Sequence, residues 1–152
     1  VEGVAEGSVE RIDFRTTLIR RFDKSPIYVA NSVLSDSEII NFSEMPFRRI
    51  RFHVGLIYQT TPEKILAIRK DIEEYIEKNK NLVDAKDQPS TIRVTNFNDS
   101  SIDMLVNCFT KSTQWHDFCI AREELLLEII EIVKRNGSDF AYPTQTIHLE
   151  KD

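Results

Sequence analysis

The spacing of apolar residues changes near residues 43–46, and this change constrains the fold more than any other feature of the chain. Before it, short apolar runs alternate with turn-forming residues, a pattern typical of a small β-barrel. Strands are predicted there in residues 9–14, 16–22, 27–30 and 38–42. After it, longer runs with strand and helix periods alternate. We therefore predict an α+β chain with a β-domain in residues 1–45 and a second domain in residues 46–139.

The second domain is predicted to begin with a long strand in residues 47–58 and a helix in residues 61–79. Pro62 suits the first helical position, because the N–H that it lacks would have no partner there. Isoleucines then recur at three- and four-residue steps and form one apolar stripe: Ile65, Ile68, Ile72 and Ile76. A hairpin of two strands, in residues 91–97 and 102–110, is predicted to follow.

A second helix is predicted in residues 115–135, with apolar residues on one side: Phe118, Ala121, Leu125, Ile129 and Ile132. Asn136 and Gly137 end it, because glycine adopts the left-handed conformation that closes a helix without a Cβ clash. From residue 47 onward the order is β-α-β-β-α with a closing strand. This is ferredoxin-like topology, an α/β sandwich with two helices on one face of a largely antiparallel sheet.

The closing strand is expected in the C-terminal segment, residues 140–152. Pro143 stands at its start, where a missing N–H costs little. Beyond Pro143, a polar face alternates with a mostly apolar one: Thr144, Thr146 and His148 against Gln145, Ile147 and Leu149. A strand of this kind needs a partner, which is either the sheet of its own domain or a strand of another copy.

Three motifs stand in one order along the chain. The block V-E-x-I-x-x-R-[ST]-T-x-I-R-x-F-D begins at Val9, the triplet A-N-S follows at residues 30–32, and F-x-[FY]-P-x-Q-T-x-H-L occupies residues 140–149. Together, and with Trp115 and Phe118 between them, these motifs resemble the cytoplasmic part of the small-conductance mechanosensitive channel family, the MscS family. The residues that this resemblance marks are Arg15, Thr17, Arg20, Asp23, Asn31, Pro143 and Gln145.

Two features depart from the family pattern. Ala30 stands where the family has a proline, so the turn that follows is expected to be less rigid. The chain begins at Val1 without a methionine, and neither a membrane-spanning helix nor a complete first strand of the β-domain precedes the Val9 block. We therefore expect the chain to be a piece of a longer membrane protein.

The resemblance implies an Sm-like β-barrel for residues 1–45, incomplete at its N-terminus, and a homoheptamer that surrounds a hollow chamber. It implies that residues 144–149, one strand from each copy, form a small parallel β-barrel on the symmetry axis. It also implies that the complete protein lies in the inner (plasma) membrane of a bacterium, with this part on the cytoplasmic side. Such a protein releases permeating ions and small osmolytes on hypo-osmotic shock, when membrane tension opens a pore in its transmembrane part.

The sequence argues against a transmembrane helix within this chain and against a nucleic-acid-binding domain. The longest apolar runs, in residues 104–106 and 125–127, fall far short of the roughly 18 residues of a transmembrane helix. The formal net charge is −5, whereas a nucleic-acid-binding domain usually carries a basic face. On a strand, Arg49 and Arg51 share one face and Arg48 points to the other, so they form no continuous basic stripe. We expect no nucleic-acid partner.

Metal binding and catalysis find little support in the sequence. His53, His116 and His148 fall on separate elements. His116 and Cys119 have the i, i+3 spacing of a ligand pair, but a second pair to complete a site is missing. Neither a G-x-S-x-G motif nor a glycine-rich phosphate loop occurs. We predict no enzyme activity, metal or cofactor, with Cys108 and Cys119 as buried thiols.

The favoured interpretation is the cytoplasmic vestibule of a mechanosensitive ion channel. The alternative is a free-standing ferredoxin-like module that binds a small ligand and has a regulatory role, because a fold alone does not fix a function. Trp115, at the start of a predicted helix, is interpreted as an anchor in the core or in an interface. The acidic helix positions are interpreted as solvated faces or as the lining of an aqueous chamber.

Overall fold

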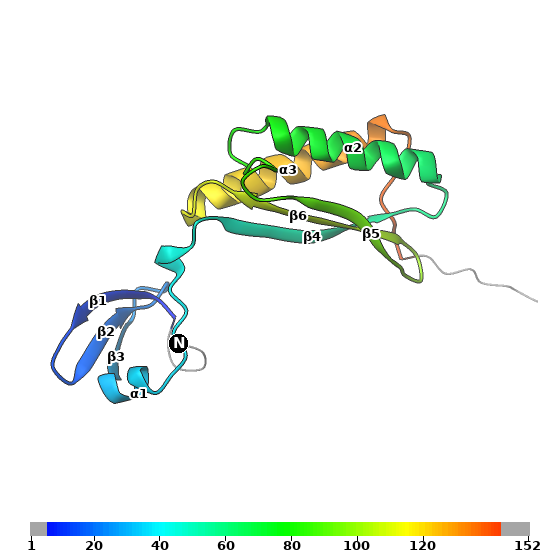
Figure 1. The fold of residues 1–152 in the computed structure, drawn as a ribbon. Helices are drawn as coiled ribbons and strands as arrows, with labels where there is room; N and C mark the ends of the chain where they lie inside the picture. The colour runs from blue at the N-terminus through cyan, green and yellow to red at the C-terminus, as the bar shows by residue number, and fades with distance from the viewer. Residues whose placement is uncertain (1–5, 144–152) are drawn as a thin grey trace, which may run out of the picture. The chain divides into compact units, whose positions relative to one another are not determined.

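The computed structural model describes residues 6–143 (Figure 1). The chain divides into two compact units, with the boundary between Glu44 and Met45. We call the part up to Glu44 the first unit and the part from Met45 the second unit, and each is described by itself. None of the helices in the described residues is long and apolar enough to cross a membrane.

The first unit is built on a three-stranded antiparallel sheet in the order β1-β2-β3. The strands are β1 (Ser8–Ile12), β2 (Thr16–Arg20) and β3 (Pro26–Ala30), and a short helix α1 (Asn31–Ser35) and a 3-10 turn η1 (Phe42–Glu44) follow. The buried side chains of this unit come from β2 and β3: Thr17, Leu18, Ile19 and Val29. The three strands are those predicted from the sequence, each shifted by no more than two residues at either end.

The prediction of a strand in residues 38–42 is wrong. Residues 38–41 have no regular structure, and Phe42 begins the 3-10 turn η1. The side-chain oxygen of Asn41 accepts a hydrogen bond from the Ser43 N–H (3.0 Å), and its amide donates one to Glu44 (2.9 Å). Such local bonds between side chain and backbone favour a turn over a strand ladder. The neighbouring Ile39 and Ile40 are both exposed, so they lack the alternation of a half-buried strand.

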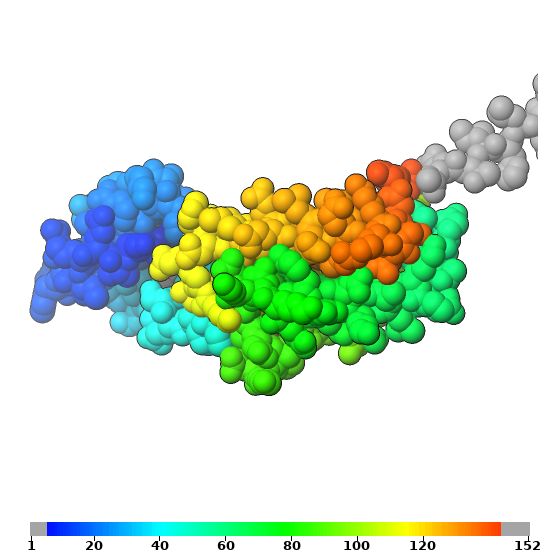
Figure 2. Space-filling model, turned by 90° about the horizontal axis from the view of Figure 1, so that it is seen from above, coloured from blue at the N-terminus to red at the C-terminus, as the bar shows by residue number. Residues whose placement is uncertain are grey.

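The second unit is an antiparallel three-stranded sheet covered on one face by two helices (Figure 1). The strands lie in the order β4-β6-β5, which are β4 (Arg48–Leu56), β6 (Ile102–Thr110) and β5 (Thr91–Phe97). The helices are α2 (Pro62–Lys78) and α3 (Trp115–Arg135), and they lie side by side over the sheet (Figure 2). The bounds of β5, β6 and α3 are those predicted from the sequence.

The core of the second unit lies between the sheet and the helices. Side chains of β6 alternate strictly between buried and half-buried, because successive residues point to opposite faces. The predicted helix stripes are confirmed: Ile68, Ile72 and Ile76 of α2 are buried, as are Phe118, Ala121, Leu125, Ile129 and Ile132 of α3. Ile65 packs against this core from a partly buried position.

After α3 the chain returns to the outer edge of β4. Gly137 closes the helix with a φ of +66°, as the sequence predicts. Phe140 forms an antiparallel bridge with Leu56, and the Ala141 N–H donates a hydrogen bond to the Gly55 carbonyl (2.9 Å). Pairing of the last segment beside the first strand of the unit is the arrangement that ferredoxin-like topology requires. The strand predicted in residues 144–149 lies outside the described residues.

Candidate functional site

Asn31 connects three backbone segments of the first unit. Its side-chain oxygen accepts a hydrogen bond from the Thr17 hydroxyl (2.8 Å). Its amide donates to the carbonyls of Asp13 (2.9 Å) and Phe14 (3.3 Å), and its backbone N–H donates to the Arg15 carbonyl (2.9 Å). Two of the predicted motif residues, Thr17 and Asn31, are thus brought together, and they fix the turn between β1 and β2 against the start of α1.

The side chain of Arg20 stabilises the turn between β2 and β3. Its Nε and Nη2 donate to the two carboxylate oxygens of Glu10 (both 2.8 Å), and its Nη1 donates to the Lys24 carbonyl (3.0 Å). The Glu10 hydrogen bond raises the pKa of Arg20, and the Arg20 hydrogen bond lowers the pKa of Glu10. The carboxylate of Asp23 accepts from the Ser25 hydroxyl (2.6 Å) and N–H (2.9 Å), bonds that lower the pKa of Asp23.

The remaining motif residues do not join these networks through their side chains. Arg15 is exposed beside Phe14 at the tip of the first hairpin, and its side chain has no partner among the described residues. Pro143 is exposed, and Gln145 lies outside the described residues. Ala30 has a φ of −62°, which lies within the range that a proline ring imposes. The backbone of residue 30 therefore has a conformation that a proline could also adopt.

Trp115 is not a core residue, because 63% of its surface is exposed. Its ring stacks on that of Phe118, with 5.4 Å between the centroids. The guanidinium of Arg48 lies 5.2 Å from the Trp115 centroid and 5.4 Å from the Phe118 centroid, within the range of a cation–π contact. This cluster links the first residue of β4 to the first turn of α3.

The two thiols differ, which corrects the prediction that both are buried. Cys108 is buried in β6, and burial raises the pKa of its thiol to about 12. Cys119 is exposed because it lies on the outer side of α3, next to the buried Phe118. His53 and His116 are also exposed, and residues 6–143 contain no cluster of three side chains able to hold a metal ion. His148 lies outside the described residues.

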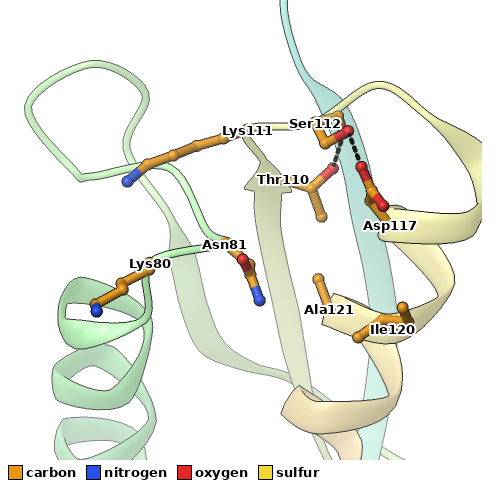
Figure 3. Close-up of a pocket in the computed structure, with 8 residues that line it drawn as sticks. All are labelled: Lys80, Asn81, Thr110, Lys111, Ser112, Asp117, Ile120 and Ala121. Carbon is orange, nitrogen blue, oxygen red and sulfur yellow. Dashed lines mark hydrogen bonds between the residues drawn. The ribbon is translucent and has the colours of Figure 1, made fainter.

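The second unit contains a pocket of about 260 Å³ between the end of α2, the end of β6 and the start of α3 (Figure 3). It is lined mainly by polar and charged residues, which are Lys80, Asn81, Thr110, Lys111, Ser112, Asp117, Ile120 and Ala121. The Lys111 N–H donates a hydrogen bond to the Asn81 carbonyl (3.0 Å), which joins the two loops at its rim. The Ser112 hydroxyl donates to Oδ2 of Asp117 (2.7 Å).

Sequence reasoning did not find this pocket. Lys80 and Lys111 are distant in the sequence and lie in loops that carry no recognisable motif. They line the same pocket because the loop after α2 bridges to the end of β6 at Leu82 and Thr110. The pocket thus forms only through tertiary contacts, which no pattern in a single sequence indicates.

Comparison with family models assigns both units. The model described as "Mechanosensitive ion channel, beta-domain" matches residues 3–44, and the model described as "Mechanosensitive ion channel MscS, C-terminal" matches residues 50–140.

Relatives in bacteria and archaea share the sequence. The chain is 37% identical over 145 residues to the low conductance mechanosensitive channel YnaI of Escherichia coli. It is 35% identical over 148 residues to the small-conductance mechanosensitive channel MscMJ of Methanocaldococcus jannaschii. These alignments cover 95% and 97% of the chain, and 41% of each relative. The chain thus spans less than half the length of these relatives.

Solved structures show the same fold. Helicobacter pylori MscS in its closed state superposes with a TM-score of 0.77 at 25% identity, over 99% of this chain and 56% of that one. Arabidopsis thaliana MSL1 superposes with a TM-score of 0.83 at 24% identity, over 93% of this chain and 50% of that one. The chain therefore belongs to the MscS family of mechanosensitive ion channels and carries the beta-domain and the C-terminal domain of that family.

Proposed function

We propose that this chain is the cytoplasmic vestibule portion of a mechanosensitive channel that releases ions and small osmolytes on hypo-osmotic shock. The observation that carries the proposal is the order of the two family matches. The beta-domain model covers residues 3–44, and the C-terminal model follows directly in residues 50–140. Channel relatives align over almost the whole of this chain and extend well beyond it. A pore formed by other segments of the complete protein fits this arrangement.

The proposed assembly is a homoheptamer on the cytoplasmic side of the inner membrane of a bacterium. Residues 1–45 form the Sm-like β-domain, residues 46–139 the ferredoxin-like domain, and residues 140–152 a C-terminal strand. Residues 144–149 of each copy pair around the symmetry axis, which satisfies the backbone groups at both edges of every strand. Membership of a channel family supports self-association.

In this proposal the chain transports solutes and catalyses no reaction. Its relatives are named as channels. The motif residues of the first unit form turns through internal hydrogen bonds, so their proposed role is to hold the β-domain together. Arg15, the exception, offers an exposed cation at a hairpin tip for contact with another part of the channel.

A chimera tests the proposed function. The corresponding segment of Escherichia coli YnaI is replaced by this chain, and patches from cells that lack their own mechanosensitive channels are stretched by suction. We expect tension-gated currents, and native mass spectrometry of the chimera should show seven copies. A chimera that reaches the membrane in normal amounts but never opens would contradict the channel assignment and favour a free-standing ligand-binding module.

The C-terminal strand has its own test. Ending the chimera after Pro143 removes residues 144–152 and retains the bridge between Phe140 and Leu56. We expect this truncation to weaken the assembly and to leave the helices folded by circular dichroism. An unchanged number of subunits would show that the strand does not join the copies.

A further inference from the structure

We propose that Pro143 prevents the C-terminal segment from pairing with the β4 edge of its own domain, and so leaves that segment available to another copy of the chain. The first half of the proposal rests on backbone hydrogen bonds within the second unit. The second half, in which the free segment pairs with other copies, rests on the proposed function.

The chain begins to pair with the outer edge of β4 just before Pro143. The Ile57 N–H donates a hydrogen bond to the Asp139 carbonyl (3.2 Å), and the Ala141 N–H donates to the Gly55 carbonyl (2.9 Å). These two bonds fix the antiparallel register. They also show which residues of β4 direct their N–H and C=O groups to the outer edge, because neighbouring residues of a strand direct them to opposite edges. The odd-numbered residues of β4 face outward.

Continued pairing would place Pro143 opposite His53. Hydrogen-bonded pairs alternate with non-bonded pairs along an antiparallel ladder, so the pair after Ala141 and Gly55 that exchanges bonds is Pro143 with His53. The His53 carbonyl would need an N–H donor from residue 143, and proline has none. An edge strand tolerates proline where its nitrogen faces solvent, but this register directs the nitrogen at β4. The ladder therefore ends before Pro143.

The chain leaves β4 at this point in the structure. Continued pairing would place Tyr142 opposite the buried Val54, on the side of the sheet that the helices cover, yet 68% of the Tyr142 surface is exposed. Neither Tyr142 nor Pro143 has regular secondary structure. Within residues 6–143, the outer edge of β4 from Arg49 to His53 has no strand partner.

The side-chain alternation after Pro143 also disagrees with this edge. In the same register, Thr146 would fall opposite the buried Ile50, on the side that packs against the helices. Ile147 would fall opposite the exposed Arg49, on the open side of the sheet. Docking on the own sheet would thus bury the polar face and expose the apolar one, whereas pairing among copies is free to adopt another register.

The first test is solvent exchange measured by NMR in the ¹⁵N-labelled 152-residue chain, at a concentration where it is monomeric. Pro143→Ala restores the missing donor, so the amides of Arg51 and His53 should exchange more slowly than in the parent chain. One hydrogen bond corresponds to about fivefold in an equilibrium, so we expect a slowing of at least about fivefold. Pro89→Ala is the matched control, because Pro89 is an exposed proline in the loop before β5. It should change neither rate.

Two further variants, both made in the Pro143→Ala chain, distinguish a missing donor from a general effect of proline. Gln145→Pro removes an N–H that would face β4 opposite Arg51, so fast exchange of the Arg51 amide should return. Thr144→Pro removes an N–H that would face solvent, so the Arg51 and His53 amides should remain slow.

The link to assembly is tested in the YnaI chimera. A segment held by its own sheet is less available to other copies, so Pro143→Ala should reduce the fraction of complete rings in native mass spectrometry. Rings that are weakened by truncation after Pro143 but unaffected by Pro143→Ala would overturn the second half of the proposal. Rings unaffected by the truncation itself would show that the proposed strand pairing among copies is wrong, and the exchange of Arg51 and His53 would still decide the first half.

Three results of the exchange measurements overturn the first half. Equal rates in the parent and Pro143→Ala chains mean that the proline is not what keeps the segment off β4. Slow exchange of Arg51 and His53 already in the parent chain means that this edge is paired despite the proline. Equal effects of Gln145→Pro and Thr144→Pro mean that the segment does not continue in the register of Ala141 and Gly55.

Discussion

The Thr17 hydroxyl donates a 2.8 Å hydrogen bond to the side-chain carbonyl of Asn31, although the two residues are 14 positions apart. Thr17 is buried, with 4% of its surface exposed. Asn31→Ala would leave that hydroxyl without its partner and would also remove the amide that donates to the carbonyls of Asp13 and Phe14. Leaving a buried polar group unsatisfied costs about 1–3 kcal/mol.

We therefore expect Asn31→Ala to destabilise the first unit by about that amount. Hydrogen exchange of the β2 amides measures the change, because these amides report the opening of this unit. Ser32→Ala is the matched control, since Ser32 is exposed and its side chain forms no hydrogen bond with a described residue. Equal exchange rates in the two variants would mean that the Thr17–Asn31 network does not stabilise the unit.

The α2 helix offers a matched pair of substitutions in the second unit. Ile72 is fully buried, so Ile72→Ala should destabilise this unit by about 2–5 kcal/mol through lost contacts and a cavity. Leu66 lies on the same helix but is 53% exposed, so Leu66→Ala should change stability by no more than about 0.5 kcal/mol. Urea unfolding followed by Trp115 fluorescence measures both, because Trp115 is the single tryptophan of the chain. Similar midpoints for the two variants would contradict the burial pattern of α2.

The stability of the first unit should depend on pH through Glu10. The hydrogen bond from Arg20 lowers the pKa of Glu10 below its ordinary value of 4.5. The folded unit therefore binds the Glu10 proton less readily than the unfolded chain does. This contribution to stability is present above the unfolded pKa and is lost as the pH falls through the folded pKa. An NMR titration of the Glu10 carboxyl carbon measures the folded value.

Arg20→Gln should raise the pKa of Glu10 toward 4.5. Arg11→Gln is the control, because Arg11 pairs with Asp13 and should leave the Glu10 titration unchanged. A Glu10 titration that is the same with and without Arg20 would show that the two groups do not interact in solution.

The first unit should open more readily than the second. Its buried apolar side chains among the described residues are only Leu18, Ile19 and Val29. The second unit buries a cluster that extends from Ile50 on β4 to Val133 on α3. Hydrogen exchange should therefore be faster for the amides of β2 than for those of β6. Equal protection would indicate that the first unit gains burial from a partner, as it would in an assembled ring.

The fold of the second unit was largely predictable because its local signals agree with its tertiary structure. The isoleucine period predicted α2, and Asn136 with Gly137 predicted the end of α3. The strand predicted in residues 38–42 is wrong because Ile39 and Ile40 favour a strand locally, whereas the sheets of the described residues offer them no strand to pair with.

The candidate sites were less accessible to sequence reasoning. The motif resemblance marked Thr17 and Asn31, but their contact depends on the pairing of β2 with β3, which places Thr16 opposite Ala30. The position of Arg20 in the motif does not indicate that its side chain bonds to Glu10, which lies on the neighbouring strand β1. The pocket is lined by residues from two separate loops, including Lys80 and Lys111, and no pattern in the sequence connects these loops.

The contrast between Cys108 and Cys119 gives this chain a natural attachment point for spectroscopic probes. The thiolate is the species that reacts with maleimides and thiosulfonates, and at neutral pH a buried thiol with a pKa of about 12 supplies very little of it. The exposed Cys119 on α3 should therefore take up one fluorophore or spin label without any engineered cysteine. In a ring of identical copies, every label sits at the same radius. The set of distances between the labels would then count the copies and measure the diameter of the ring in a single experiment.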